Sequence, residues 1–271
     1  MRRWKSGPRY LTNPFLPVER IDGPGVFETM RSYGGRILAL DMHVDRLWES
    51  AAGIGRAVPW TKRDVRDWIT GAARASREPD AMVRVLVSFS ETGNTILAAF
   101  VRPFAGHPAR LYRNGVAVRT SSVRKSAPRA QSPQVKSNQV LGAVFSFLET
   151  RRSRFFETLF LNREGFLTEG TVSNFFVAKR GRLFTPAPSC GILLGVTRHR
   201  VIKAARASGL ACEETILSRH DLYCADEAFL TTTLAEVMPV VRCDARRIGE
   251  GRPGPVTRRV HTAFRSRIDD D

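Results

Sequence analysis

The alternation of apolar and polar residues predicts strands in the first part of the chain. Residues 26–33 alternate, Gly34–Gly35 supplies a hairpin turn, and residues 36–40 read as the return strand. Residues 83–89 and 95–102 read as two further strands because they are rich in β-branched and aromatic residues. We therefore expect four strands here, two of them joined in a hairpin.

Two segments between these strands have the periodicity of helices. Asp41 is placed to cap a helix that runs to Gly55, with apolar residues at helical spacing. Thr61 opens a second helix that runs to Ser76, and Asp64 three residues on gives a near-capping box. Strands and helices together predict a small N-terminal α+β domain over residues 1–118.

The second half of the chain alternates strands with helices. Residues 119–133 are rich in Ser, Arg and Pro and predict an interdomain linker, followed by a larger domain over residues 134–271. In that domain we expect helices at 137–153, 197–208 and 255–265, and strands at 156–162, 171–178, 183–185, 228–232 and 237–242.

Charge adds a second hypothesis. The chain of 271 residues has 43 Lys+Arg against 26 Asp+Glu, a net charge of +17, which invites nucleic-acid binding. The arginines are spread along the whole chain, however, and no zinc-finger, RNP or P-loop pattern is present. A basic, catalytically silent nucleic-acid-binding protein therefore stays as an alternative from another class.

The lengths of the apolar runs and the spacing of the cysteines predict where in the cell the protein is located. No apolar run approaches the roughly 20 residues of a membrane span, and no apolar segment follows the basic N-terminal residues. Cys190, Cys212, Cys224 and Cys243 show neither a CxxC pair nor histidines at metal spacing. We expect reduced thiols, no metal site and a cytoplasmic protein.

Lysine is scarce, and one lysine stands at a conspicuous place. Lys136 follows Ser132–Pro133 and precedes an apolar-periodic segment. Lysine can lose its proton and attack a carbonyl, whereas arginine cannot, so Lys136 is a candidate Schiff-base nucleophile. The alternative is a solvated lysine at a helix start.

Four other positions supply what pyridoxal phosphate needs. Glu169 offers a carboxylate for a ring nitrogen, and Thr197 follows a Gly turn at a helix start, where phosphate binds. Thr233 ends a run of three threonines, and Arg46 offers a guanidinium. Each alone also fits a structural role, as a surface strand residue, helix cap, β-propensity tract or solvated arginine.

In order along the chain, these segments resemble the class IV, or fold-type IV, pyridoxal-phosphate aminotransferases. That family includes branched-chain aminotransferases, D-amino-acid transaminases, (R)-selective amine transaminases and aminodeoxychorismate lyases. The resemblance covers most of the chain, from Gly25 to Val240. The matching stretches are GVFETMRSYGGRI, HVDRL, VKSNQVLGAV, LTEGTVSNFF, GILLGVTR and TTTLAEVMPV.

The resemblance implies a fold and a set of roles. The fold is α+β (α/β), a two-domain fold-type IV enzyme with a small N-terminal α+β domain and a larger C-terminal β-barrel-like domain with helices. Lys136 would carry the cofactor and move the substrate proton, and Glu169 would pair with the pyridine nitrogen. The other implied cofactor-binding residues are Arg46, Ser173, Asn174, Leu193, Val196, Thr197, Thr232 and Thr233.

The substrate residues depart from any one member of the family. Phe27 stands where transaminases often carry a Tyr, and Arg84 resembles the arginine that branched-chain enzymes aim at a substrate side-chain carboxylate. Thr29 stands where the lyases use a hydroxyl, and Leu234 completes the implied substrate set. Arg84 can equally be an exposed strand arginine.

These observations favour transamination between an amino acid and a 2-oxo acid by a homodimer of branched-chain or D-amino-acid aminotransferase type. The alternative within the family is a lyase that releases pyruvate and 4-aminobenzoate from 4-amino-4-deoxychorismate. Both reactions begin with loss of the substrate α-proton and separate afterwards.

Overall fold

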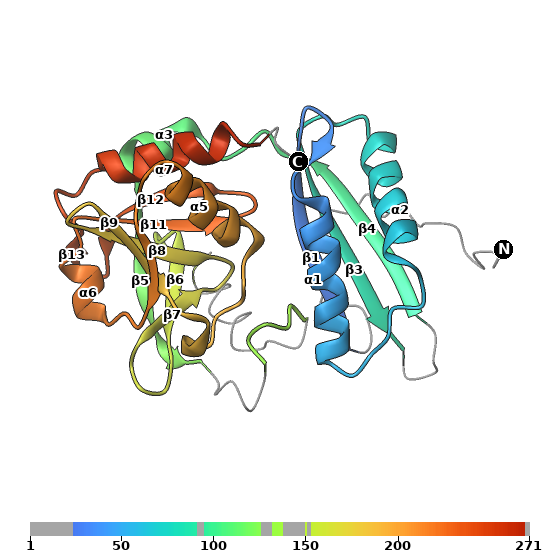
Figure 1. The fold of residues 1–271 in the computed structure, drawn as a ribbon, viewed down its shortest axis with the longest axis horizontal. Coiled ribbons are helices and arrows are strands. Elements are labelled where there is room, and N and C mark those ends of the chain that lie inside the picture. The colour runs from blue at the N-terminus through green and yellow to red at the C-terminus, as the bar shows by residue number, and fades with distance from the viewer. Residues whose placement is uncertain (1–23, 91–94, 126–131, 138–149, 151–152, 269–271) are drawn as a thin grey trace. The chain divides into compact units, whose positions relative to one another are not determined.

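A computed structural model of the chain describes residues 24–90, 95–125, 132–137, 150 and 153–268. Their contacts divide the chain into two compact units (Figure 1). The first unit holds residues 24–90, 95–105 and 135–137, and the second unit holds residues 106–125, 132–134, 150 and 153–268. Each unit has its own sheet and its own hydrophobic core.

The first unit is built on a four-stranded sheet in the order β2-β1-β3-β4, with every neighbouring pair antiparallel. All four predicted strands are present. Their bounds are β1 (Gly25–Tyr33), β2 (Arg36–Ile37), β3 (Ala81–Phe89) and β4 (Thr95–Pro103).

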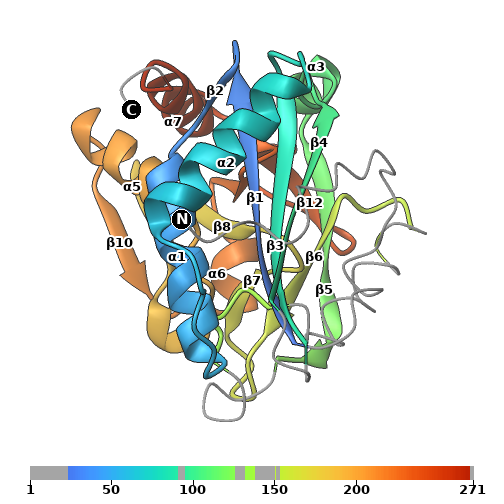
Figure 2. The ribbon, with the colours of Figure 1, turned by 90° about the vertical axis from the view of Figure 1, so that its right-hand side faces the viewer.

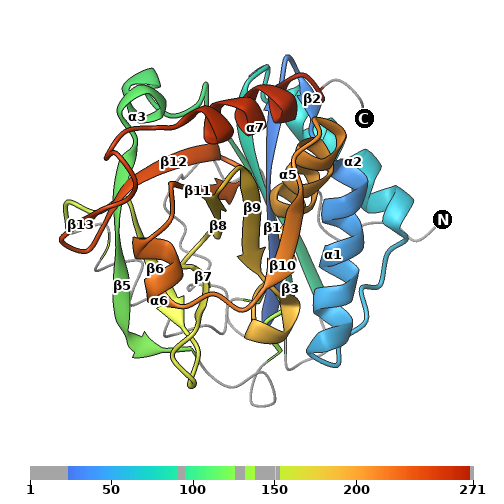
Figure 3. The same ribbon diagram turned by 60° about the vertical axis from the view of Figure 1, so that its left-hand side comes forward.

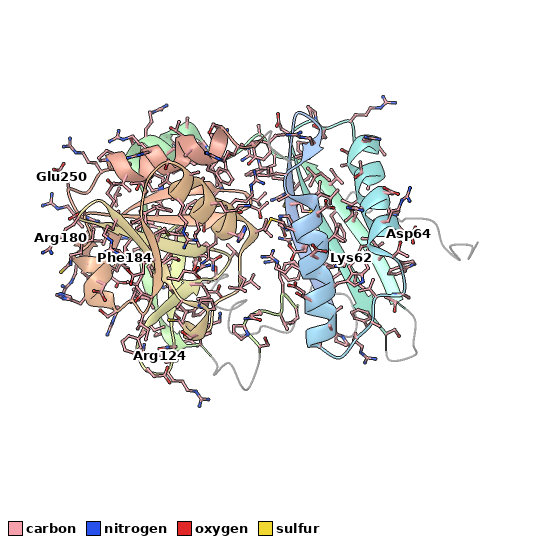
Figure 4. All side chains as sticks on the ribbon, in the orientation of Figure 1. Lys62, Asp64, Arg124, Arg180, Phe184 and Glu250 are labelled. Atoms are coloured by element: carbon pink, nitrogen blue, oxygen red, sulfur yellow. The ribbon has the colours of Figure 1, made fainter. Side chains whose placement is uncertain are left out.

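Two helices, α1 (Leu40–Gly53) and α2 (Lys62–Ala75), cover one face of this sheet (Figure 2). The predicted cap of α2 is confirmed as a full capping box: the Asp64 amide donates to Thr61 Oγ1 at 3.1 Å, and the Thr61 amide donates to the Asp64 carboxylate at 3.3 Å. Figure 4 labels Lys62 and Asp64 at this end of the helix.

The period of two in β1 separates the two faces of the sheet. Val26 and Met30 belong to the core that packs against the helices and are 0% and 1% exposed. Glu28 shares their side of the strand because it lies between them at the same spacing. Phe27 and Thr29 point to the other side.

The second unit holds a nine-stranded sheet whose order is β10-β9-β8-β11-β12-β5-β6-β7, with β13 paired to β12. The pairs β5–β6, β5–β12 and β9–β10 are parallel, and the others are antiparallel. The strand bounds are β5 (Val116–Arg124), β6 (Glu157–Leu161), β7 (Leu167–Gly170), β8 (Asn174–Lys179), β9 (Arg182–Pro186), β10 (Cys212–Thr215), β11 (Glu227–Thr232), β12 (Glu236–Cys243) and β13 (Arg246–Arg247).

Helices cover this sheet, and α5 and α7 lie side by side (Figure 3). The bounds are α3 (Ala109–Asn114), α5 (Val196–Ala207), α6 (Arg219–Tyr223) and α7 (Pro255–Arg265), with a 3-10 turn at Pro188–Cys190. Every helix of the described residues is too short or too polar to cross a lipid bilayer.

Some sequence expectations differ from the structure, and one lies largely outside the residues that the structure describes. Residues 119–124, expected to begin a linker, form the end of β5, and Arg124 projects outward there (Figure 4). The expected strand 171–178 begins only at Asn174. The helix expected at 137–153 lies largely outside the described residues. The division into units likewise falls elsewhere than at residues 118 and 134, because residues 106–125 join the second unit and residues 135–137 the first.

Candidate active site

Lys136 is held near the start of β1 by its own backbone. Its carbonyl accepts a hydrogen bond from the Phe27 amide at 3.1 Å, and its amide donates to Ser50 Oγ at 3.1 Å. Ser137 forms a β-bridge with Val26, and Lys136 Nζ lies 5.0 Å from the centre of the Phe27 ring. The predicted nucleophile is therefore fixed in the first unit by bonds that do not involve its ammonium group.

Glu28, His43 and Arg46 form a buried cluster between β1 and α1. Glu28 accepts from Arg46 Nε at 2.6 Å and Nη2 at 2.7 Å, and from His43 Nδ1 at 2.7 Å. Burial alone would raise the pKa of Glu28, but Arg46 and His43 outweigh burial and lower it to about 2. Burial lowers the pKa of His43 against the opposing effect of Glu28. An ionised Glu28 therefore holds the Arg46 guanidinium through two parallel bonds.

Three of the four residues expected to bind substrate lie together on the opposite face of the same sheet. Thr29 and Arg84 are directly opposite one another in the β1–β3 register, and Arg84 Nε donates to Thr29 Oγ1 at 3.1 Å. The Arg84 guanidinium lies 5.6 Å from the centre of the Phe27 ring. A guanidinium beside a hydroxyl and an aromatic ring suits a ligand that has both a carboxylate and an apolar part.

Glu169 sits in β7 of the second unit in a network of its own. Its Oε2 accepts from the Leu193 amide at 2.7 Å and from Asn174 Nδ2 at 3.2 Å. Its Oε1 forms an ion pair with Lys125, whose Nζ also donates to the Gly191 carbonyl at 2.7 Å. The structure thus brings Glu169, Asn174 and Leu193 together as expected, and it adds Lys125.

A second carboxylate organises the loop that follows Glu169. Glu157 is 3% exposed and accepts bonds from Thr171 Oγ1 at 2.6 Å, the Thr171 amide at 3.1 Å, the Val172 amide at 3.2 Å and Ser173 Oγ at 3.0 Å. A Cβ at Gly170 would lie 2.8 Å from the Glu157 carboxyl carbon, so this approach requires glycine. Burial raises the pKa of Glu157 against the effect of these bonds. Ser173, expected to bind cofactor, here donates to Glu157.

The start of α5 is suited to an anion. Gly195 is its N-cap and supplies no side-chain cap, so the amide groups of the first turn, from Val196 and Thr197 onward, lack a capping side chain. The partial positive charge of a helix N-terminus favours phosphate. A Cβ at Gly195 would overlap the Oδ1 of Asn174, so the turn is packed against the Glu169 network.

The threonine run lies at the end of β11, in the turn that leads to β12. Thr232 Oγ1 accepts from the Leu234 amide at 3.1 Å and the Ala235 amide at 3.2 Å, and Thr233 precedes Leu234 in the same turn. Glu236 ends the turn with φ of 54°, a left-handed conformation that costs free energy in a non-glycine residue. Its buried carboxylate accepts from His261 at 2.8 Å, which ties the turn to α7.

Comparison with known proteins identifies the family of this fold. The family described as amino-transferase class IV matches residues 25–243, a span that includes both Lys136 and Glu169. The chain belongs to the class IV aminotransferases. It is 31% identical to the branched-chain-amino-acid aminotransferase of Pseudomonas aeruginosa over 89% of this chain and 83% of that protein. It is 32% identical to the D-alanine aminotransferase of Bacillus licheniformis over 91% and 88%.

A solved structure agrees with this assignment. The chain is similar to the branched-chain amino acid aminotransferase of Escherichia coli, with a TM-score of 0.83 and 30% identity over 90% of this chain and 85% of that one. It is also similar to a T.th. branched-chain amino acid aminotransferase solved with pyridoxamine 5'-phosphate. There the TM-score is 0.85 and the identity 26%, over 92% and 86% of the two chains. The predicted two-domain fold-type IV class is therefore confirmed.

Membership in the class IV aminotransferases also decides between the sequence hypotheses. The chain is an enzyme that carries out transamination with pyridoxal 5'-phosphate as its cofactor. The catalytically silent nucleic-acid-binding alternative is wrong. The lyase alternative is not favoured, because the relatives named above are aminotransferases.

The residues of this aminotransferase fit the cofactor. Glu169 has a fixed carboxylate, the kind of group that can pair with a protonated ring nitrogen, and the N-terminus of α5 has no side-chain cap, an arrangement that favours phosphate. In the first unit, Arg46 is a fixed cation and Lys136 supplies an amine on a fixed backbone.

Sequence reasoning missed Glu28, His43, Lys125 and Glu157. Lys125 carried the same signal as Lys136, since it too is one of only a few lysines in an arginine-rich chain. Glu28 carried a different signal, because it is a charged residue in the apolar register of β1. Nothing in the local sequence marks Glu157.

Proposed function

We propose that Lys136 and Glu169 carry the chemistry of this aminotransferase. When bound, pyridoxal phosphate supplies a carbonyl carbon and an electron-withdrawing ring. Lys136 Nζ would remove the proton from the substrate α-carbon and deliver it to the carbon that carried the cofactor's carbonyl group. Glu169 holds the ring nitrogen in its protonated form. The fixed carboxylate of Glu169, held by the Leu193 amide at 2.7 Å, is the observation that best supports this assignment.

We also propose phosphate-binding residues, for each unit by itself. In the second unit, Val196 and Thr197 contribute amide groups of the first turn of α5, and Thr232 and Thr233 contribute the β11–β12 turn. In the first unit, Arg46 is the cation proposed to bind a phosphate. A phosphate monoester is well matched by amide groups, hydroxyls and one guanidinium.

For the substrates, we propose branched-chain L-amino acids as donors and 2-oxoglutarate as acceptor. Arg84, bonded to Thr29, binds the second carboxylate of the acceptor, and Phe27 contacts the apolar side chain of the donor. The branched-chain relative supports this choice. The D-alanine aminotransferase of Bacillus licheniformis, at similar identity, makes D-alanine the second candidate donor.

Absorbance of the purified enzyme tests the first step. We expect a visible band that borohydride removes in the wild type and that is absent in Lys136→Ala. Lys203→Ala is the matched control, because Lys203 is an exposed lysine on α5, and it should keep the band. A Lys136→Ala protein that retains the borohydride-sensitive band would refute Lys136 as the nucleophile.

The donor is tested by half-reactions. L-valine, L-leucine, L-isoleucine and D-alanine are each added alone, and conversion to the pyridoxamine form is followed by absorbance. Faster conversion with the three L-amino acids supports the branched-chain assignment, and faster conversion with D-alanine overturns it. In Arg84→Gln, KM for 2-oxoglutarate should rise about tenfold or more with little change in conversion by L-leucine, because a charge-assisted bond to one substrate is lost.

Three further expectations belong to the same proposal. We propose a homodimer, to be measured by light scattering after size exclusion. We propose a cytoplasmic enzyme, which the four free cysteines support because a reducing compartment keeps thiols unpaired. The predicted domain limits, 1–118, 119–133 and 134–271, are tested by limited proteolysis; because residues 119–124 form the end of β5, we expect the first cut within 125–133.

A further inference from the structure

Two adjacent helices of the second unit, α5 and α7, form a single surface. The Arg259 guanidinium at the middle of α7 bonds the Ser208 carbonyl at the end of α5. The Arg200 guanidinium of α5 bonds the Arg267 carbonyl just past α7. The helices therefore run antiparallel in contact, as Figure 3 shows, and their outer sides face solvent together.

The two segments that form this surface, called here the α5/α7 face, contain basic residues and no acidic ones, although Glu213, Glu214, Glu250 and Asp269–Asp271 flank them in the sequence. Residues 195–211 and 251–268 contain no Asp or Glu. The same two segments contain nine Lys or Arg and two His: Arg198, His199, Arg200, Lys203, Arg206, Arg252, Arg258, Arg259, His261, Arg265 and Arg267.

Neighbouring carboxylates neutralise only part of this charge. Glu214 pairs with Arg198, and Glu236 pairs with Arg265. Glu250, labelled in Figure 4 at the outer edge of the unit, pairs with Arg252.

Four exposed cations keep their full charge. Among the described residues, no carboxylate pairs with Lys203, Arg206, Arg258 or Arg259. The three guanidinium groups bond backbone carbonyls, which leave the positive charge in place. The α5/α7 face is thus a concentrated positive surface on a protein whose net charge is already +17.

The side chains of the α5/α7 face favour a nucleic acid over an anionic membrane as its partner. A helix that binds an anionic membrane inserts apolar side chains. Here Val201 and Val260 are 0% exposed and Phe264 is 3% exposed, so the apolar sides of both helices are already buried in the unit. Both helices are described along their whole length, and neither exposes a large apolar residue. Guanidinium groups without apolar neighbours match the phosphates of a nucleic-acid backbone, which bind through charge and need no insertion.

We propose that the α5/α7 face is a docking surface for nucleic acid, bound through its phosphate backbone without sequence selection, in addition to the aminotransferase activity. Lys203, Arg206 and Arg259 form its centre, where the end of α5 meets the middle of α7. None of the three belongs to the residues assigned to the cofactor or substrate. The surface and the active site are therefore separable by mutation.

The test compares two variants that lose the same charge from different places. The first is Lys203→Gln, Arg206→Gln, Arg259→Gln on the α5/α7 face. The second, matched control is Arg242→Gln, Arg246→Gln, Arg247→Gln on β12 and β13, where all three arginines are exposed in the same unit. Binding of the holoenzyme to a fluorescein-labelled 20-nucleotide single-stranded RNA is measured by anisotropy between 25 and 200 mM KCl.

The expected result is a loss of tenfold or more in affinity for the first variant and less than threefold for the control. The slope of log affinity against log salt should fall by about 2 in the first variant alone, since each lost phosphate contact contributes about 0.7 for a single strand. Equal losses in both variants would overturn the proposal, because net charge alone would then explain binding. Binding to phosphatidylglycerol vesicles that is tighter than binding to RNA at equal salt would also overturn it.

Two further measurements separate this proposal from the proposed function. Aminotransferase activity of the first variant should equal that of the wild type, and Lys136→Ala should bind the RNA as the wild type does. If Lys136→Ala keeps the visible band, the catalytic assignment fails while the docking surface stands. If RNA affinity is lost with Lys136→Ala but kept in the first variant, the docking surface is wrong.

Discussion

The buried carboxylate of Glu28 should stabilise the first unit through its bonds to Arg46 and His43. It is 1% exposed and accepts three bonds, two from Arg46 and one from His43. Its pKa is lowered from 4.5 to about 2. At 1.36 kcal/mol per unit, this shift corresponds to about 3 kcal/mol of stability at neutral pH.

The sign of this contribution fixes its pH dependence. A carboxylate with a lowered pKa in the folded state stabilises the fold at pH values above its unfolded pKa. For Glu28, the contribution is complete above about pH 5 and is lost as the pH falls from 4.5 towards 2. At pH 3, somewhat less than half remains. In Glu28→Gln, this part of the pH dependence should disappear, because the amide does not titrate in this range.

The assay is urea denaturation of the cofactor-free protein followed by tryptophan fluorescence. All four tryptophans lie before residue 70, so the signal reports the part of the chain that contains Glu28. We expect Glu28→Gln to lose about 3 kcal/mol at pH 7 and about 1 kcal/mol at pH 3. The control Glu49→Gln, an exposed residue of the same helix as Arg46, should change by less than about 0.5 kcal/mol. A Glu28→Gln loss that is constant between pH 3 and pH 7 would refute the assignment of this stability to an ionised pair.

Three other changes test the second unit. Lys125→Met should lower the unfolding free energy of the cofactor-free protein by about 1–3 kcal/mol, because Glu169 loses its ammonium partner. Thermal melting followed by circular dichroism measures this loss. Lys125→Arg, the control, should restore most of the stability. Glu157→Gln should lower the unfolding free energy by about 1–3 kcal/mol, because the loop after Glu169 loses the carboxylate that accepts its hydrogen bonds. The same change should weaken pyridoxal phosphate binding, measured by absorbance titration. Unchanged cofactor affinity would contradict this role. Gly195→Ala should weaken cofactor binding by about tenfold or more, because its Cβ meets the Asn174 side chain and displaces the turn that we propose to bind the phosphate. Gly71→Ala, with open space around it, should leave the affinity unchanged.

Local periodicity was sufficient for elements whose polar and apolar faces differ. The strands of the first unit and helices α2, α5 and α7 were predicted within a few residues for this reason. It failed for β5, because only Val116 and Val118 face the core and the last three residues of the strand, Ser122, Val123 and Arg124, are exposed. The neighbours of β5 are β6 and β12, both paired in parallel and distant in sequence. The residues of β5 and their near neighbours in sequence therefore cannot predict that this segment pairs with β6 and β12.

The candidate site shows the same limit at the level of single residues. The roles of Lys136 and Glu169 stay predictions, which rest on residue type and on the order of motifs that together point to one cofactor. The Lys125–Glu169 and Glu28–Arg46 pairs were not predicted, because they join residues 44 and 18 positions apart that only the folded backbone brings together. Of these residues, Glu28 was the most accessible to sequence reasoning. A charged residue in the apolar register of a strand must find a buried partner, and α1 follows the β1–β2 hairpin in the chain.

Glu28, Glu157 and Glu169 each hold neighbouring groups of the chain in place through a largely buried carboxylate. Each is a largely buried carboxylate, and each is satisfied by cations, hydroxyls or amide groups of the chain itself. Burial disfavours the charged form of a carboxylate, so a buried carboxylate without hydrogen-bonding partners tends to take up a proton. The partners therefore hold each carboxylate in place, and the carboxylates in turn hold Arg46, the loop at Thr171–Ser173 and the Leu193 amide. Because these bonds exist within the chain alone, the groups that we propose to bind the cofactor are oriented before it binds, which would reduce the ordering cost of binding.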